Sequence, residues 1–544
     1  MRPPLQIPLA VFGPLDWAVV AGYFGLMFCI GHLTARRKTD AEGYFLGGRR
    51  MPVVAVALSI VATSLSIATF IGVPQFSMNG DLTYLSQNLG VFIAAFIVAT
   101  VFLPRFYAAG TVTIYGYIDQ RLGDTARIAT SAMFLFGRLL ASGVRLFFAA
   151  IPVCLLIFGK LEPTKGQLIA AIVIIGAVGV AYTVAGGIRA VIVTDCVQLC
   201  IVIGSCVLGI ALLLHKIPIG LHEIVNVLSD PHAGPYGSKL KLIDTSLDTT
   251  RPFTLWTALI GATFLNTASL GVDHDLAQRM LTTRSAWRGS MSLIASQFVS
   301  VIVVSLFMAI GLLLYVFYKR PDVMGAAAPT DQLKASFQVY PQFLLNHLPT
   351  GLCGLAIAGM FAAAQGSLDS AINAMASSAV ADLYWPLMAR RGGKADISSK
   401  TPRLAVAGMG AALIGFAIAA AMYYDPHGKQ SLLDFALGVM SFAYTGMLGV
   451  FLTALLTRRG STTSVLLALA AGLIVTTLLQ DAVYGAWTGW LFGLPHRLAQ
   501  FWWMPIGTLI CFAICVCGRP RVARPPAQAD HSEDQTAVAA ASEA

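Results

Sequence analysis

The chain has 544 residues, which is enough for three or four soluble domains or for one domain that crosses a membrane many times. Apolar residues make up 57% of it and charged residues 11%, whereas soluble chains average about 45–50% and about 25%. So few charges cannot cover a water-facing surface, and the composition excludes a disordered, collagen-like or coiled-coil chain as well. The net charge of +10 comes from short clusters between apolar runs, a pattern typical of membrane topology and not of nucleic-acid binding.

The sequence offers no cofactor or enzyme motif. Its nine cysteines lie in apolar runs, form no CxxC pair and have no histidine at ligand spacing, so they predict neither disulfides nor zinc. It contains no Walker A loop, GxGxxG or HExxH motif. An intramembrane hydrolase would need a serine beside a histidine, and the only histidine near a polar span motif is His274. We therefore expect a membrane protein that is not an enzyme and has no cofactor.

A helix needs about 20 mostly apolar residues to cross a bilayer. Thirteen segments approach or exceed this length, which predicts an all-α polytopic membrane domain over residues 1–518. The segments are 15–33, 52–77, 83–104, 128–157, 166–185, 190–214, 253–271, 289–318, 350–384, 404–424, 432–456, 462–481 and 498–518.

Basic residues predict the orientation of these spans. Alternate connecting segments, beginning with the one that holds Arg36, Arg37 and Lys38, carry most of the lysines and arginines. The positive-inside rule then places the N-terminus outside and the C-terminus in the cytoplasm, in an inner (plasma) membrane. Residues 519–544 are rich in Pro, Ala, Gln and Glu and have no hydrophobic pattern, so we expect a disordered cytoplasmic tail there.

The second span, 52–77, is chemically unusual. Five hydroxyl side chains crowd its middle, and a glycine and a proline follow: Ser59, Thr63, Ser64, Ser66, Thr69, Gly72 and Pro74. Hydroxyl groups compete for backbone hydrogen bonds, so we expect this helix to open. Opened carbonyl groups can hold a cation, and half-helix N-termini can hold a carboxylate. Close packing of small residues between helices is the alternative explanation.

A second interruption occurs five spans later. In span 253–271, Asn266 and Ser269 lie just before a polar run over 273–279. Two discontinuous helices in corresponding halves indicate a binding site between inverted repeats. We expect these core repeats at about 52–214 and 253–456.

Four of the charged residues inside the spans are notable, because a charge there is expected to cost about 2.5–3.5 kcal/mol. Asp195 and Asp369 are acids, whereas Arg138 and Arg145 lie seven residues apart on one helix face. Asp195 is either a cation or proton site or a carboxylate bonded to Arg189 or to backbone near the inner surface. The two arginines either bind an anionic solute or pair with Asp369 or another acid.

At these motifs the chain resembles the sodium:solute symporter family, which includes carriers of galactose, proline and sialic acid. The resemblance covers about residues 40–460, and its five motifs occur in the family's order: 44–52, the Ser/Thr-rich span to Pro74, 186–198, 266–279 and 361–373. It implies the LeuT-type fold, with ten core helices in two inverted repeats and extra helices at both ends. The independent count of about thirteen transmembrane helices agrees with that architecture.

The resemblance also implies a sodium site. The residues that match its ligands are backbone carbonyl groups and one hydroxyl group: Ala62, Leu65, Ala363 and Ser367. Gly366 replaces a serine that is usual in the family and removes one oxygen ligand, whose place could be taken by a water or by Gln365. Asp195 matches an acid that supports sodium coupling or binds a second sodium.

The family binds its solute between the opened helices. The matching positions carry hydroxyl and amide groups: Thr63, Ser66, Thr69, Gln87, Asn266 and Ser269. Arg145 could hold a carboxylate, as an arginine of the third span does in sialic acid carriers. Ala68 and Ser269 stand where sugar carriers have an acid and an aromatic gate, which argues against a galactose-like sugar.

We therefore expect a secondary active transporter that couples Na⁺ to the symport of a small organic solute, such as a carboxylate or amino acid, by alternating access. Its expected partners are Na⁺, the solute and the lipid bilayer, with no nucleic acid. A proton-coupled symporter of the same fold and a non-transporting membrane solute sensor are the alternatives.

Overall fold

The computed structural model describes residues 12–35, 40–158, 164–329, 339–392, 400–423, 432–492 and 498–519, and within them the chain is helical, without a β-strand. The helices are α1 Pro14–Ala35, α2 Ala41–Leu46, α3 Val53–Ser64, α4 Ile67–Asn79, α5 Gln87–Ile97, α6 Leu103–Ala109, α7 Tyr115–Leu122, α8 Asp124–Phe158, α9 Lys165–Lys216, α10 Leu221–Ser229, α11 Thr263–Gly271, α12 His274–Leu281, α13 Ala286–Lys319, α14 Pro321–Met324, α15 Val339–His347, α16 Leu352–Ser378, α17 Trp385–Arg390, α18 Lys400–Tyr423, α19 Leu432–Leu456, α20 Thr462–Leu479, α21 Asp481–Phe492 and α22 Trp503–Val516.

Among the described residues, eight helices are long and apolar enough to cross a membrane, or nine if the bent pair formed by 41–49 and 53–64 is one span. The longest, α9, covers two of the predicted spans. Gly187 divides it with φ 59° and ψ −161°, a conformation that costs glycine little because it has no Cβ. The number of crossings stays a prediction, whereas the all-helical membrane architecture is confirmed.

The second predicted span is broken where its hydroxyl groups gather. Helix α3 ends at Ser64 and α4 begins at Ile67, and the two residues between them, Leu65 and Ser66, are extended. The side chain of Thr69 accepts a hydrogen bond from the backbone N–H of Ser66 at 3.4 Å and so caps the second half-helix. The expected opening of this helix is therefore present.

The second predicted interruption is also a break. Helix α11 ends at Gly271, and α12 begins at His274 after Asp273, which is extended with ψ 116°. The side chain of Asp273 accepts a hydrogen bond from the backbone N–H of Asp275 at 2.9 Å and starts the new helix. Every residue of α12 is buried, so its charged side chains lie inside the bundle.

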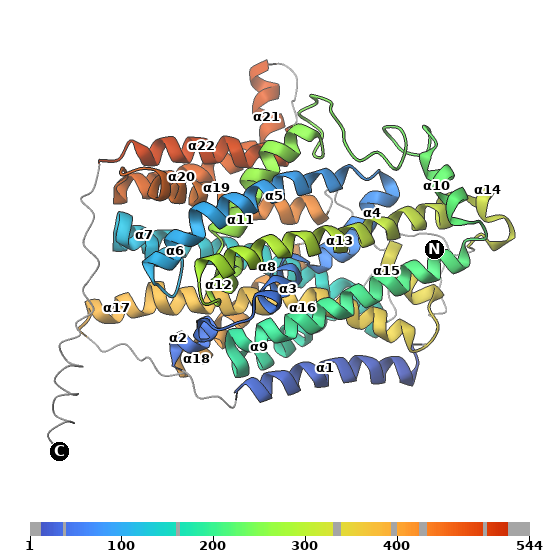
Figure 1. Ribbon diagram of the computed structural model, residues 1–544, viewed down its shortest axis with the longest axis horizontal. Coiled ribbons are helices and arrows are strands. Elements are labelled where there is room, and N and C mark those ends of the chain that lie inside the picture. The colour runs from blue at the N-terminus through green and yellow to red at the C-terminus, as the bar shows by residue number, and fades with distance from the viewer. Residues whose placement is uncertain are drawn as a thin grey trace.

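Helix α16 lies in the middle of the bundle, where it contacts α9, α1, α18, α8, α12 and α3 (Figure 1). Helix α1 lies at one edge in this view, and α20 and α22 lie at the opposite edge, packed on α19. Asp16 links α1, at the edge, to α16, in the middle of the bundle. One of its carboxylate oxygens accepts the backbone N–H groups of Gly351 at 2.7 Å and Gly354 at 2.6 Å, at the start of α16.

The predicted tail lies outside the described residues from position 520 onward, so its disorder stays a prediction.

Candidate functional site

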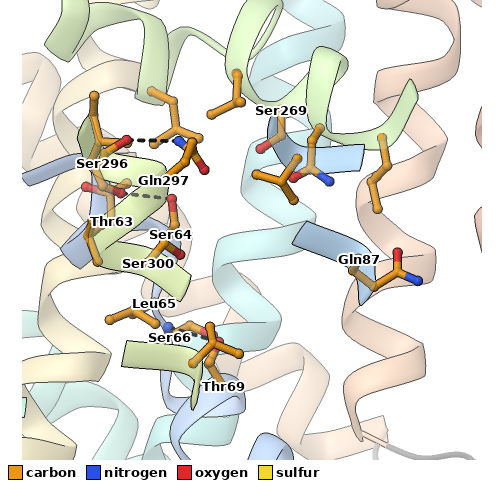
Figure 2. Close-up of a pocket in the computed structure, with 18 of the residues that line it drawn as sticks. Thr63, Ser64, Leu65, Ser66, Thr69, Gln87, Ser269, Ser296, Gln297 and Ser300 are labelled. Carbon is orange, nitrogen blue, oxygen red and sulfur yellow. Dashed lines mark hydrogen bonds between the residues drawn. The ribbon is translucent and has the colours of Figure 1, made fainter. Parts of the chain in front are cut away.

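A cavity of about 240 Å³ opens beside the break between α3 and α4. The helices α3, α4, α5, α8, α11, α12 and α13, which are spread along the sequence, all contribute to its lining. The structure brings all the predicted solute positions to this lining: Thr63, Ser66, Thr69, Gln87, Arg145, Asn266 and Ser269. Figure 2 shows Thr63, Ser66 and Thr69 on one side of the cavity, and Gln87 and Ser269 across from them. The seven residues therefore face one shared space.

Local hydrogen bonds fix several of these side chains. The hydroxyl of Thr63 donates to Ser59 O at 2.8 Å and lies 3.1 Å from the hydroxyl of Ser370. Asn266 donates to Ala262 O at 2.8 Å through its amide nitrogen. The amide nitrogen of Gln87 lies 3.5 Å from Pro252 O, while its buried amide oxygen has no partner among the described residues. The wall thus presents polar groups with remaining hydrogen-bonding capacity.

The sequence reasoning missed part of the wall. Ser296, Gln297 and Ser300 of α13 line the cavity together, and Figure 2 shows them beside Thr63 and Ser64. The amide nitrogen of Gln297 donates to the hydroxyl of Ser296 at 2.9 Å. Positions 296 and 300 are four residues apart and lie on one helix face. This four-residue spacing of serines is the sequence pattern that could have indicated a polar face on this helix.

Aromatic rings gather beside the cavity near the end of α4. Tyr84 and Phe501 line it, and both pack near Phe253 with ring centroids 5.2 and 5.7 Å away. Phe76 of α4 completes the cluster at 4.8 Å from Phe253. The ammonium group of Lys239 holds this end of α4 by donating to Met78 O and Gly80 O, each at 2.8 Å.

Two arginines of α8 supply all the charge in the cavity lining. Arg138 pairs with Asp273 at 2.8 Å and with Asp275, and its side chain is 4% exposed. Its partners are therefore two acids of the α11–α12 break, and the alternative pairing with Asp369 is wrong for Arg138. Arg145 lies two helical turns further along the same face.

A buried polar network continues from Arg138 toward α9. Arg279, at the end of α12, pairs with Asp275 at 2.9 Å and with Asp195 at 3.3 Å, and all three are fully buried. The hydroxyl of Ser59 also donates to Asp195. The expected alternative, a bond from Asp195 to Arg189, is wrong, because Arg189 donates to Gly47 O at 2.7 and 2.9 Å instead.

Oxygen atoms surround the position where Gly366 lacks a side chain. A Cβ there would lie 3.0 Å from Gln198 Oε1, 3.3 Å from Ala62 O and 3.6 Å from Asp195 Oδ1. We call these three atoms the Gly366 oxygen cluster. Gln198 Oε1 and Asp195 Oδ1 are buried and have no hydrogen-bond partner among the described residues. Unpartnered buried oxygens are costly and are the ligands that a hard cation prefers, so this donor set fits Na⁺.

The other expected sodium ligands lie on either side of the end of α3 and in α16. Ala62 and Leu65 flank the end of α3, whereas Ala363 and Ser367 lie one turn apart in α16. The hydroxyl of Ser367 donates back to Ala364 O at 3.1 Å. Gln365 does not lean toward Gly366, because its Oε1 lies 2.6 Å from the hydroxyl of Tyr182.

His274 has a serine neighbour that sequence spacing did not indicate. Its Nε2 lies 3.3 Å from the hydroxyl of Ser377. No described group bonds to its Nδ1, and neither residue lines the cavity. A serine nucleophile needs a base that a third group orients and a space for substrate, so this contact is a packing contact between α12 and α16.

The fold is shared with a solved Na⁺-coupled sialic acid symporter in its substrate-bound, outward-open state. The two structures superpose with a TM-score of 0.76 at 23% identity, over 94% of this chain and 100% of the other. This likeness confirms the LeuT-type fold that the family resemblance implied.

Two curated relatives are similar along most of the chain. A sodium/sialic acid symporter of Proteus mirabilis is 26% identical over 85% of this chain and 89% of its own length. The human sodium-coupled monocarboxylate transporter 1 is 27% identical over 86% of this chain and 73% of its own length. The model of the sodium:solute symporter family matches residues 44–472. The chain is therefore a Na⁺-coupled membrane transporter, not an enzyme, and belongs to the sodium:solute symporter family.

Proposed function

We propose that this transporter carries a small organic carboxylate together with Na⁺ into the cell across the cytoplasmic membrane. The solute binds in the cavity beside the α3–α4 break. Its carboxylate faces Arg145, and the rest of the molecule meets a polar wall made of Thr63, Ser66, Thr69, Gln87, Asn266 and Ser269.

The charge of the cavity lining carries this proposal. Both charged residues in the lining are arginines, while Asp273 and Asp275, which offset Arg138, do not line it. A cavity of this kind favours an anion, and a guanidinium group offers two parallel donors that match a carboxylate. Two relatives described above are named for sialic acid and for monocarboxylates, which are carboxylic acids as well.

The sodium ion is assigned to the opened end of α3. The carbonyl oxygen of Ala62 faces Gly366 of α16, and the carbonyl groups of Leu65 and Ala363 and the hydroxyl group of Ser367 are its proposed fellow ligands. Asp195 contributes the negative charge, or binds a second Na⁺. The Gly366 oxygen cluster supports this assignment because it gathers unpartnered oxygens around Ala62 O.

Sodium then prepares the solute site. A cation bound at the end of α3 holds Leu65 and Ser66 in their extended conformations, and these residues also line the solute cavity. The bound cation has therefore already ordered part of the backbone that the solute contacts. Linkage is reciprocal, so Na⁺ and solute raise each other's affinity, typically by about 5- to 150-fold.

The distribution of basic residues supports an orientation with the N-terminus outside. In that orientation the aromatic cluster around Phe253 lies on the outer side of the cavity, and α12 with Arg279 lies on the inner side. For import by alternating access, the side with the aromatic cluster opens to the outside first, and the side with α12 opens to the cytoplasm afterwards.

Thermal melting of the detergent-purified protein tests the function. Carboxylates, amino acids, sugars and vitamins are each added in Na⁺ or in K⁺. A ligand at 100 times its dissociation constant stabilises the protein by about 2.7 kcal/mol. A carboxylate is expected to raise the melting temperature in Na⁺ and not in K⁺.

Uptake into proteoliposomes under an inward Na⁺ gradient then tests transport of the same compound. The Arg145→Gln protein is the matched control, since it should keep the sodium response and lose the carboxylate response. Stabilisation by a neutral sugar but by no carboxylate would contradict the proposal.

A further inference from the structure

Arg138 ties α8 to the break between α11 and α12. Its Nη1 donates to Asp273 Oδ2 at 2.8 Å, and its Nη2 pairs with Asp275. Asp273 is the cap of α12, and Asp275 lies in the first turn of that helix. A guanidinium group that bridges two buried carboxylates is held strongly. We call these two ion pairs the Arg138 lock, and they fix the start of α12 to α8.

The lock lies at the edge of the solute cavity. Arg138 lines the cavity, whereas Asp273 and Asp275 do not. The Nε–H group of Arg138 is buried and has no acceptor among the described residues. A buried donor without a partner is costly. Arg138 therefore keeps one donor for an acceptor that enters the cavity.

Arg145 brings a carboxylate into reach of this donor. The two arginines lie on one face of α8 and line the same cavity. Arg138 and Asp273 are electrostatic neighbours of Arg145. A negative charge held by Arg145 attracts Arg138 as well, and this attraction is stronger inside the protein than in water. The solute then competes with Asp273 and Asp275 for Arg138, and a neutral solute does not.

The two acids keep other partners when Arg138 turns to the solute. Asp275 is also paired with Arg279 at 2.9 Å. Asp273 also accepts the hydroxyl of Tyr444 and the backbone N–H of Asp275. A buried carboxylate left alone would be costly, but neither acid is left alone here. The lock can therefore open without leaving an unpaired charge.

We infer that Arg138 is the residue through which a bound carboxylate releases α12, so that the inner side of the cavity opens only when solute is present. Na⁺ alone leaves the lock closed. A ligand shifts an equilibrium only through its different affinities for the two states. The carboxylate favours the state in which Arg138 has left Asp273 and Asp275. This inference rests on the proposed carboxylate solute and on the proposed inner position of α12.

Amide exchange of the purified full-length protein, followed by mass spectrometry, tests the lock without any solute. In NaCl alone, residues 274–281 of α12 should exchange about tenfold faster in Asp273→Asn, because a hydrogen bond to a charged partner is weakened. Asparagine still caps the helix. In proteoliposomes without solute, Na⁺ should leak faster through this variant than through the unmodified protein.

Asp382→Asn is the matched control. Asp382 is also a buried acid, but it accepts from the hydroxyl groups of Thr113 and Ser378. Its replacement should leave the exchange of α12 and the Na⁺ leak unchanged. The same increase in Asp382→Asn as in Asp273→Asn, or no increase in Asp273→Asn, would overturn the inference.

Arg138→Lys supplies a second variant in case Asp273→Asn does not fold. Lysine keeps the positive charge but lacks the fork that bridges two carboxylates. Exchange of α12 in NaCl alone should therefore rise in this variant too. A lysine variant with unmodified exchange would show that the bridge does not hold α12.

Solute addition tests the release of the lock. Lactate, pyruvate and sialic acid are the carboxylate probes, and lactamide is the uncharged counterpart of lactate. In NaCl, a carboxylate that raises the melting temperature should also speed exchange of α12 in the unmodified protein, whereas lactamide should not. Stabilisation by a carboxylate with unchanged exchange of α12 would overturn the inference and leave the proposed function intact. If no carboxylate raised the melting temperature, the proposed function would fail instead, and Asp273→Asn would still report the lock.

Discussion

Arg279 of α12 and Asp195 of α9 form an ion pair at 3.3 Å, in which both side chains are fully buried. The guanidinium group of Arg279 also donates to Ser370 of α16. One side chain thus bridges α12, α9 and α16 and contacts Asp195, whose Oδ1 belongs to the Gly366 oxygen cluster. Asp195, the acid proposed to support sodium binding, and the helix α12 are therefore held together by the same contact.

Replacing Asp195 by asparagine is expected to weaken sodium dependence. The substitution keeps the shape of the side chain and removes its charge, while Arg279 retains its pair with Asp275. The Na⁺ concentration for half-maximal uptake should rise about 5-fold or more, with little change in solute affinity at saturating Na⁺. Uptake measured over a Na⁺ series checks this. The exposed Asp322→Asn change serves as the control, and unaltered sodium activation in Asp195→Asn would remove Asp195 from the coupling site.

Restoring a hydroxyl at Gly366 should tighten sodium binding. A serine there would place its oxygen among the unpartnered oxygens of the cluster, although its Cβ requires Gln198 to shift, since their separation would be 3.0 Å. Gly366→Ala introduces the same Cβ without the oxygen and is the matched control. We expect a lower half-saturating Na⁺ concentration for serine than for alanine in the melting assay. Equal values for the two variants would mean that the missing hydroxyl is not a ligand position.

The two arginines of α8 should respond differently to replacement by glutamine. Arg138→Gln leaves Asp273 and Asp275 without one of their buried partners, so we expect a stability loss of about 3–5 kcal/mol. Arg145→Gln should mainly weaken binding of the carboxylate. Melting curves with and without the solute separate the two effects. A ligand response that survives in Arg145→Gln would show that the carboxylate is held elsewhere.

Asp16→Ala should loosen the contact between α1 and α16. The start of α16 has no capping side chain of its own, and Asp16 accepts two of its N–H groups instead. Loss of such a cap costs about 0.5–2 kcal/mol. We expect a lower melting temperature, together with faster amide exchange at Gly351 and Gly354. Asp322→Ala, which removes an exposed pair with Arg320, should change neither.

Much of this architecture could be predicted from the sequence because it depends on local patterns. The hydroxyl groups around Ser64 predicted the break in the second span, and the polar run after Ser269 predicted the second break. Hydrophobic runs long enough for a bilayer predicted the helices, although two of these runs lie in one element, α9, which Gly187 divides.

The partners of buried charges could not be predicted in the same way. Asp195 pairs with Arg279, which is 84 positions away, and not with the nearby Arg189. Neither hydrophobic period nor spacing encodes such a contact, since it depends on how α9 and α12 cross. The same limit applies to Gln198, whose oxygen lies beside Gly366, where a water or Gln365 were the alternatives considered.

Phe501 lies in the wall of the solute cavity, yet it comes from the segment just before α22, beyond residue 472 where the family match ends. The residues proposed to hold sodium all lie within that match. Part of the surface proposed to contact the solute therefore lies outside the family match that contains the proposed sodium ligands. A change at Phe501 alters the shape of the cavity without touching a sodium ligand, so new solute preferences can arise in this chain while the energy source stays the same.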